Sequence, residues 1–282
     1  MTRRDPPPHL GSLTKRIGNL AADTGRPVRR IQRAVANTVI GQTLPPGVVK
    51  GGTALKLRVG ETGSRFTPDL DAARSAGTSL EDYLGALDAN LGAGWSGFTG
   101  RIVVLDPAEP DGVPADYVMQ PFDLKMQFRG KAWLTVRFEL GHDEIGSTAT
   151  PELRMADDLI DMFDTLGLDR PQPVPVLAIE HQVAQKLHAC TSIGARTGTN
   201  DRAHDLVDLQ ILDQDEKIDP DRVGPIATRL FAARQAQSWP PVVVAHEGWD
   251  TLYAAAAEGL NVLPDVARAV TWTNALIASA SR

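Results

Sequence analysis

The spacing of hydrophobic and polar positions divides this chain of 282 residues into three parts. Residues 1–43 hold a disordered Pro-rich tail and then, over 11–43, apolar positions at helical spacing that predict two helices. Residues 44–145 contain short alternating runs over 46–142, which predict strands with one helix near 79–92. Residues 146–282 show helical patterns separated by Pro or Gly near 151–166, 178–194, 201–213, 220–236, 247–259 and 263–281. The chain is therefore predicted to be an α+β protein with a basic helical arm, an α/β core and a helical C-terminal part.

The stretch KGGTALKLRVGETGSRFTPDLD, Lys50 to Asp71, carries the most informative pattern. An apolar pair before it predicts the end of a buried strand, and Gly51 and Gly52 allow a tight turn into a helix from Thr53. Bare backbone amides at the start of such a helix, with the Thr53 hydroxyl as a further donor, suit a phosphate group. Taken alone, a Gly-Gly pair is also an ordinary turn.

Two aspartates follow in the same stretch. Asp69 and Asp71 are two residues apart, and at that spacing on a strand both side chains project from one face. Converging carboxylates suit Mg²⁺, and two metal ions about 3.5 to 4 Å apart stabilise the attacking and leaving oxygens in phosphoryl transfer. A single Asp-x-Asp is also common at solvated strand ends, but its order and close spacing with the glycine turn favour nucleotide chemistry. A P-loop or dinucleotide-binding glycine pattern is absent from the sequence.

A second block lies in the helical part. Lys186 sits at the edge of an apolar helical stripe and so can enter a cleft, although a lysine there can also simply extend from a packed helix to solvent. Arg202, Asp205 and Asp208 are three residues apart and share one helix face. A solvated Arg-Asp ladder is the alternative interpretation of that face.

Together the two blocks resemble the polymerase-beta-type nucleotidyltransferases, and specifically the AbiEii and MenT toxins of type IV toxin–antitoxin systems. The family's downstream signature is a helix with Gln-Lys-Leu-His-Ala and then Arg-Ala-His-Asp-Leu-x-Asp-Leu. This chain has VAQKLHAC and NDRAHDLVDLQIL. The matching blocks span roughly residues 40–215, and the flanks resemble the family only in helical character. The resemblance implies a polymerase-beta-like core of a small mixed sheet with helices.

The resemblance also implies an activity. A Mg²⁺-dependent enzyme would move a nucleoside monophosphate, with pyrimidines as donors, from a nucleoside triphosphate to the 3′ end of tRNA, which blocks aminoacylation and translation. A cognate antitoxin would be encoded beside it. The implied site residues are Asp69, Asp71, Lys186 and Asp208 for catalysis, Gly51, Gly52, Thr53 and Arg202 for nucleotide binding, and Asp69, Asp71 and Glu139 for the metal.

Some of these roles have alternatives. Glu139, near the end of a hairpin strand, is the candidate third carboxylate, and it is also compatible with an ordinary outward strand residue. Asp205 is expected to be a structural partner of Arg202. Thr67 stands where a related toxin carries a serine that its antitoxin system can phosphorylate, which makes it a candidate regulatory residue. It is equally compatible with an ordinary turn residue before Pro68.

Two other functions stay open. The same core could modify a protein or a small molecule, and labelled nucleotides with separate acceptors would distinguish these substrates. A catalytically idle binding or immunity module is the second alternative. The intact Gly-Gly-Thr, Asp-x-Asp and Lys186 count against an idle module.

The composition and hydrophobic pattern of the chain predict its cellular location. The chain lacks an apolar run long enough to span a membrane, and MTRRDPPPHL lacks the apolar core of a secretion signal. Its one cysteine, Cys190, cannot form an internal disulfide and fits a reducing cytoplasm. These features predict a cytoplasmic protein without a membrane partner.

Charge is unevenly distributed. The first 34 residues hold eight Lys or Arg against two acidic residues, a net +6, so the other 248 carry −12 to reach the stated −6. Such a basic arm is able to bind phosphates of an RNA acceptor, and it is also compatible with simple solvation. The basic residues considered for RNA are Arg29, Arg30, Arg33, Lys125, Arg129 and Lys131.

Overall fold

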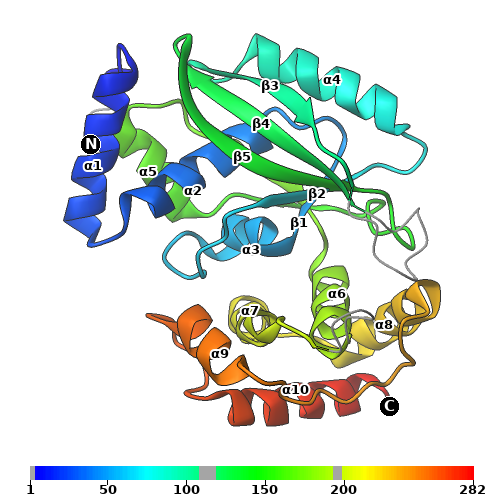
Figure 1. Cartoon of the computed structure of the whole chain (residues 1–282). Helices are drawn as coiled ribbons and strands as arrows, with labels where there is room; N and C mark the ends of the chain where they lie inside the picture. The colour runs from blue at the N-terminus through cyan, green and yellow to red at the C-terminus, as the bar shows by residue number, and fades with distance from the viewer. Residues whose placement is uncertain (1–3, 108–118, 193–198) are drawn as a thin grey trace.

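The computed structural model describes residues 4–107, 119–192 and 199–282. These residues form a seven-stranded mixed sheet with helices around it, and a separate group of helices that lies below the sheet in Figure 1. The α+β architecture predicted from the sequence is confirmed.

The strands are β1 (Gly47–Lys50), β2 (Leu70–Arg74), β3 (Phe98–Val104), β4 (Gln120–Phe128), β5 (Lys131–Gly141), β6 (Glu152–Arg154) and β7 (Val174–Val176). The helices are α1 (Leu10–Thr24), α2 (Val28–Gly41), α3 (Gly51–Val59), α4 (Leu80–Ala93), α5 (Asp157–Leu166), α6 (Ile179–Thr191), α7 (Ala203–Asp215), α8 (Pro220–Arg234), α9 (Trp249–Ala257) and α10 (Val266–Ala280). None of the helices in the described ranges is long and apolar enough to cross a membrane.

The sheet places the predicted strand-turn-helix at its centre. The strand order is β3-β4-β5-β2-β1-β7-β6, with β2 parallel to β5 and β1 parallel to β7. β1 is antiparallel to β2 and leads directly into α3. The end of β1 therefore lies beside the part of β2 that carries Asp71, and that part of β2 lies beside Glu139 of β5.

Three expectations are corrected or limited. Segment 151–166 was predicted to be one helix, but it begins with β6, which pairs antiparallel with β7 at the sheet edge, before α5 starts. The tail was predicted to be disordered, but in residues 4–9 the carbonyls of Asp5 and Pro7 accept hydrogen bonds from Arg16 (2.7 Å) and Arg129 (2.8 Å). The helix predicted for 178–194 ends at Thr191, and positions 193 and 194 lie outside the described residues.

Two hydrophobic cores meet at α3. The first core joins side chains of α1, α2, α4 and α5 with the sheet, and it includes Ala54 and Leu57 of α3. The second core joins α6 to α10 and includes Leu55 of the same helix. Figure 1 shows α3 between the sheet and α7. The division into 1–43, 44–145 and 146–282 stays a proposal, and the shared first core groups the basic arm with the sheet.

Candidate active site

Three ionisable residues form a row across the central strands. Asp71 on β2 is the Cα partner of Lys50 on β1 and of Glu139 on β5. Side chains of such paired residues project from the same face of the sheet. The predicted Asp71 and Glu139 are therefore neighbours, and Lys50, which was not singled out from the sequence, joins them.

The charges in this row act on one another. Burial, with the nearby charges of Glu139 and Asp69, raises the pKa of Asp71 to about 6, although Lys50 opposes the shift. Burial lowers the pKa of Lys50, and Asp71 is the strongest of the charges that counteract this change. Lys50 and Asp71 thus stabilise each other's charged form against the effect of burial.

Asp69 is held from two helices through its backbone carbonyl. The Thr53 hydroxyl donates to that carbonyl at 3.0 Å, and Asn37 Nδ2 of α2 lies 3.3 Å from it. Asn37 Nδ2 also donates to Thr53 Oγ1 at 3.1 Å, and both side chains are buried. Thr53 was expected to donate to a phosphate. In the structure this hydroxyl donates to the Asp69 carbonyl and so helps to position Asp69, and its contact with a phosphate stays a prediction.

The two glycines allow close approach of side chains to the start of α3. Gly51 has a φ of +63°, and a Cβ there would overlap the carboxylate of Asp71. A Cβ on Gly52 would overlap the hydroxyl of Thr67. Asp71 therefore stands against the N-terminal turn of α3, where the helix dipole favours negative charge.

Thr67, the candidate regulatory residue, is buried in this arrangement. Its side chain packs on Gly52 and is 6% exposed. Its hydroxyl has no hydrogen-bond partner in the described part of the chain. A modifying enzyme therefore cannot reach this hydroxyl unless the loop before Asp69 moves.

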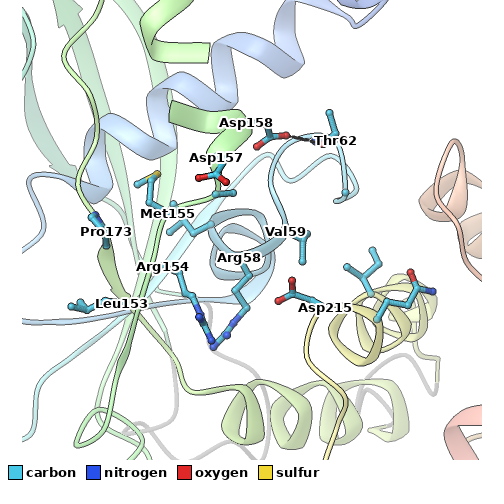
Figure 2. A pocket seen from close by; sticks show the side chains of 15 residues that line it. Arg58, Val59, Thr62, Leu153, Arg154, Met155, Asp157, Asp158, Pro173 and Asp215 are labelled. Carbon is cyan, nitrogen blue, oxygen red and sulfur yellow. Dashed lines mark hydrogen bonds between the residues drawn. The ribbon is translucent and has the colours of Figure 1, made fainter. Parts of the chain in front are cut away.

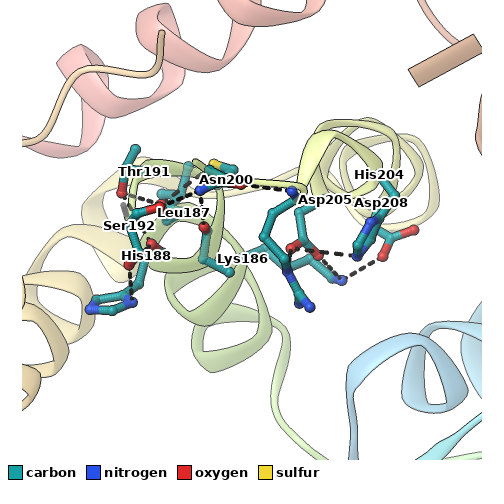
Figure 3. Close-up of polar contacts among 12 residues, drawn as sticks. Lys186, Leu187, His188, Thr191, Ser192, Asn200, His204, Asp205 and Asp208 are labelled. Atoms are coloured by element: carbon teal, nitrogen blue, oxygen red, sulfur yellow. Dashed lines mark hydrogen bonds and ion pairs between the residues drawn. The ribbon is translucent and has the colours of Figure 1, made fainter. Parts of the chain in front are cut away.

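The second block forms an ionic cluster around two buried carboxylates (Figure 3). Lys186 Nζ donates to Asp208 Oδ2 at 2.6 Å and to Asp205 Oδ1 at 3.1 Å. Arg202 Nε donates to Asp205 Oδ2 at 2.8 Å, which is the pairing expected from their spacing. Arg65 donates from Nε and Nη2 to the two oxygens of Asp208, each at 2.9 Å.

This cluster holds more positive than negative charge. Asp205 and Asp208 are 1% and 0% exposed, and they hold Lys186, Arg65 and Arg202. Burial alone would raise the pKa of Asp208, but Lys186 and Arg65 outweigh it and the pKa is lowered. Both carboxylates therefore stay charged and fix the three cations in place.

The two sequence blocks meet at a small pocket of about 60 Å³. Gly51 lines it from the first block, and Lys186, Arg202 and Asp205 line it from the second. The charge of Arg202 also lowers the pKa of Asp71, although burial and other neighbours act more strongly. Residues about 150 positions apart in sequence thus share one candidate site.

The basic residues considered for RNA are mostly used within the fold. Arg30 pairs with Glu61 and Arg33 Nη1 donates to the Thr135 carbonyl at 3.1 Å. Lys125 pairs with Asp123 at 3.1 Å, and Arg129 holds the tail as described above. These contacts engage four of the six side chains within the protein, and RNA binding by the whole set stays a prediction.

The three candidate metal ligands, Asp69, Asp71 and Glu139, are called the acidic row below, and their chemistry suits a divalent cation. Asp69, Asp71 and Glu139 provide the oxygen donors that Mg²⁺ prefers, and each of the other two raises the pKa of Asp71 through its charge. Within residues 4–107, 119–192 and 199–282, no three His, Cys, Asp or Glu side chains stand close enough together to hold a metal. The donor set fits the ion chemically, and its side chains must turn toward one another to bind it.

A larger pocket of about 680 Å³ lies apart from these residues (Figure 2). It is bounded by α3, β6, the start of α5 and α7. Arg58 and Arg154 extend toward one another there, and both bind the carboxylate of Glu152, at 2.7 and 2.6 Å. Glu152 has its pKa lowered to about 2, because these partners outweigh the effect of burial. These arginines join β6 to α3 and hold the sheet edge in place.

Comparison with known proteins identifies the class. A family model described as nucleotidyl transferase AbiEii toxin, type IV TA system, matches residues 39–272. The chain therefore belongs to the AbiEii family of nucleotidyltransferase toxins of type IV toxin–antitoxin systems, and the family predicted from the two sequence blocks is confirmed.

A solved structure supports the fold. The chain is similar to MenT4, a nucleotidyltransferase toxin from Mycobacterium tuberculosis H37Rv, at 18% identity over 94% of this chain and 99% of that chain, with a TM-score of 0.50. An antigenic nucleotidyltransferase-like protein from Paracoccidioides brasiliensis matches at 12% identity over 82% of this chain and 95% of that chain, with a TM-score of 0.34. No curated protein matches the chain.

Proposed function

We propose that this toxin transfers a nucleoside monophosphate from a nucleoside triphosphate to the 3′ end of tRNA in a Mg²⁺-dependent reaction. The observation that carries the proposal is the shared pocket of Gly51, Lys186 and Arg202 beside the acidic row. The carboxylates that would hold Mg²⁺ then lie next to the cations that would bind the triphosphate. This is the division of charge that nucleotidyl transfer requires.

In the proposed reaction the 3′-hydroxyl oxygen attacks the α-phosphorus. The bond from that phosphorus to the bridging oxygen of the β-phosphate breaks, pyrophosphate leaves, and the hydroxyl proton is released. Mg²⁺ bound by Asp69 and Asp71, with Glu139 as third carboxylate, would neutralise triphosphate charge and stabilise the reacting oxygens.

The cations of the second block are proposed to bind the triphosphate. Lys186 and Arg202 line the pocket, and their carboxylate partners Asp205 and Asp208 hold them in position. The cluster has more cations than carboxylates, so a net positive charge remains for the triphosphate. Asp208 would orient Lys186, to which it is bonded at 2.6 Å. Because these groups are already in place, little reorganisation is needed when charge develops in the transition state.

The acceptor, donor and cellular setting follow from the family resemblance. A tRNA extended at its 3′ end cannot be aminoacylated, so the proposed reaction would stop translation, with pyrimidine nucleotides as donors. Membership in a toxin–antitoxin family implies a neutralising antitoxin, which we propose is encoded beside the toxin. The proposed place of action is the cytoplasm, where tRNA is charged.

Sequencing of RNA 3′ ends tests the proposal. Purified protein is incubated with tRNA and one triphosphate at a time, with Mg²⁺ or with EDTA, and Asp71→Asn is the matched inactive control. Added pyrimidine residues that require Mg²⁺ and Asp71 support the proposal. Label from the triphosphate in protein or in small molecules, with unchanged tRNA ends, would overturn it.

A further inference from the structure

A cleft of about 650 Å³ lies between the basic arm and the helical half. It is lined by the turn from α1 to α2, by the loop around Phe66, and by the C-terminal end of α9. The lining includes four arginines but one acidic residue: Arg26, Arg29, Arg30, Arg65 and Glu258. The cleft is therefore a local basic surface on a chain whose net charge is −6.

Two of these arginines are paired with carboxylates, and the other two give the cleft its positive charge. Arg30 is paired with Glu61, and Arg65 is paired with Asp208. Arg29 is exposed, and its guanidinium carbon lies 5.7 Å from the centre of the Phe66 ring. Arg26 is half-buried at the neighbouring turn. A cation and an aromatic ring are thus presented together.

The cleft adjoins the candidate active site. Phe66 is three residues before Asp69, and three residues of extended chain span at most about 10 Å. Arg65 lines the cleft and binds Asp208, which in turn binds Lys186. A strand lying in the cleft can therefore present its end to the reacting groups.

We propose that this cleft binds the single-stranded 3′ segment of the RNA acceptor, an inference that rests on the proposed function. Phe66 stacks on a base, and Arg26 and Arg29 contact phosphates of the backbone. Aromatic stacking with cationic contacts is the chemistry by which proteins hold single strands without reading their sequence. Arg26 and Arg29 thus supply the phosphate contacts of this cleft.

The test compares Phe66→Ala, Phe66→Tyr and Arg29→Ala with the unaltered protein. Steady-state kinetics give KM for tRNA and for the triphosphate, and fluorescence anisotropy gives Kd for a synthetic RNA with the 3′ acceptor strand of tRNA. Phe66→Ala should raise Kd and KM for RNA by about 5- to 150-fold. Phe66→Tyr should leave Kd and KM for RNA close to those of the unaltered protein, because it keeps an aromatic ring. KM for the triphosphate should not change.

Salt dependence isolates the arginine. Arg29→Ala should reduce the slope of log Kd against log salt by about 0.7, the value for one phosphate contact on a single strand. Arg268→Ala on α10 is the matched control, since Arg268 is 68% exposed and lies outside the cleft lining. It should leave both Kd and the slope unchanged, and unfolding midpoints confirm that all variants fold.

The outcomes separate this inference from the proposed function. If the unaltered protein adds no nucleotide to tRNA, the proposed function fails, while anisotropy still decides whether the cleft holds RNA. Unchanged Kd for Phe66→Ala and Arg29→Ala would overturn the inference. Loss of antitoxin binding in these variants, with RNA binding retained, would also overturn it and assign the cleft to a protein partner.

Discussion

Arg65 binds both carboxylate oxygens of Asp208, with its Nε and Nη2 each 2.9 Å from an oxygen. Arg65 is four residues before Asp69, so this pair joins the loop that carries the aspartates to α7. Asp208 also accepts from Lys186, and one buried carboxylate thus holds cations from two distant parts of the chain. The position of the acidic row relative to Lys186 therefore depends on Asp208.

Arg65→Lys tests this connection, because it keeps the charge and removes the two-pronged contact. Loss of one charge-assisted hydrogen bond should lower the free energy of unfolding by about 1.5–3 kcal/mol. The rate of transfer should also fall, because the loop before Asp69 is less firmly placed. Urea unfolding and transfer kinetics measure the two effects. A variant with normal stability and normal kcat would show that the Arg65–Asp208 pair does not position the loop before Asp69.

Asp71→Asn and Lys186→Ala should both reduce transfer by about a hundredfold or more, since each removes a charge at the reacting phosphate. Their stabilities should differ. Burial already disfavours the charged form of Asp71, whereas Lys186 bridges two buried carboxylates. Removing one partner of a buried pair costs about 3–5 kcal/mol, and here Arg65 and Arg202 should reduce that cost. Thermal unfolding beside activity assays checks both expectations, and a fully active Lys186→Ala would refute the proposed role.

Local patterns explain what could be predicted from the sequence. The glycine turn, the start of α3 and the Arg129–Lys131 turn follow from residue types a few positions apart. The Arg202–Asp205 contact follows from helical spacing. Strand spacing could place Asp71 on one face, but it could not show which strand would lie beside it.

Partners that are distant in sequence explain what was missed. Asp208 finds Arg65 across 143 residues, and Thr53 finds the carbonyl of Asp69 through a loop of irregular path. Asn37 was not considered, because an asparagine within an apolar helix has no local signal for its partner. Such contacts depend on how the two cores pack on α3, and no single segment of the sequence determines that packing.

Stability should depend on pH through His188. Burial and the charge of Arg234 lower its pKa to about 4, although Glu144 opposes them. The unfolded chain takes up a proton near pH 6.5, whereas the folded one resists it. The stabilisation is therefore complete above about pH 6.5 and is lost progressively down to about pH 4, by at most about 3.4 kcal/mol.

His188→Gln should reduce this dependence without removing it, because the pKa of His204 is also lowered to about 4, mainly by burial. Urea unfolding at several pH values between 4 and 7.5 measures the slope for the two proteins. Equal slopes would mean that the imidazole of His188 takes up its proton as readily in the folded chain as in the unfolded one.

Gly52 and Thr67 should show a compensating pair of mutations. Gly52→Ala would place a methyl group on the Thr67 hydroxyl, and overpacking of this kind costs about 1–3 kcal/mol. Thr67→Ala removes the obstructing atoms, so the double variant should regain much of that stability. A double-mutant cycle by denaturant unfolding measures the coupling. Strictly additive effects would show that the two side chains do not compete for this space.

Thr67 is also the candidate regulatory position, and its burial predicts how substitutions behave. Thr67→Val should keep stability and transfer, because the hydroxyl has no hydrogen-bond partner among the described residues. Thr67→Glu should be inactive, since a larger charged side chain cannot fit against Gly52 and would repel the anionic triphosphate beside Asp69 and Asp71. Phosphorylation would add about −1.5 to −2 charges at the same place and requires the loop to open first. Co-expression with the antitoxin followed by intact-mass measurement tests this proposal, and a neutralised toxin without added phosphate would mean inhibition by another route.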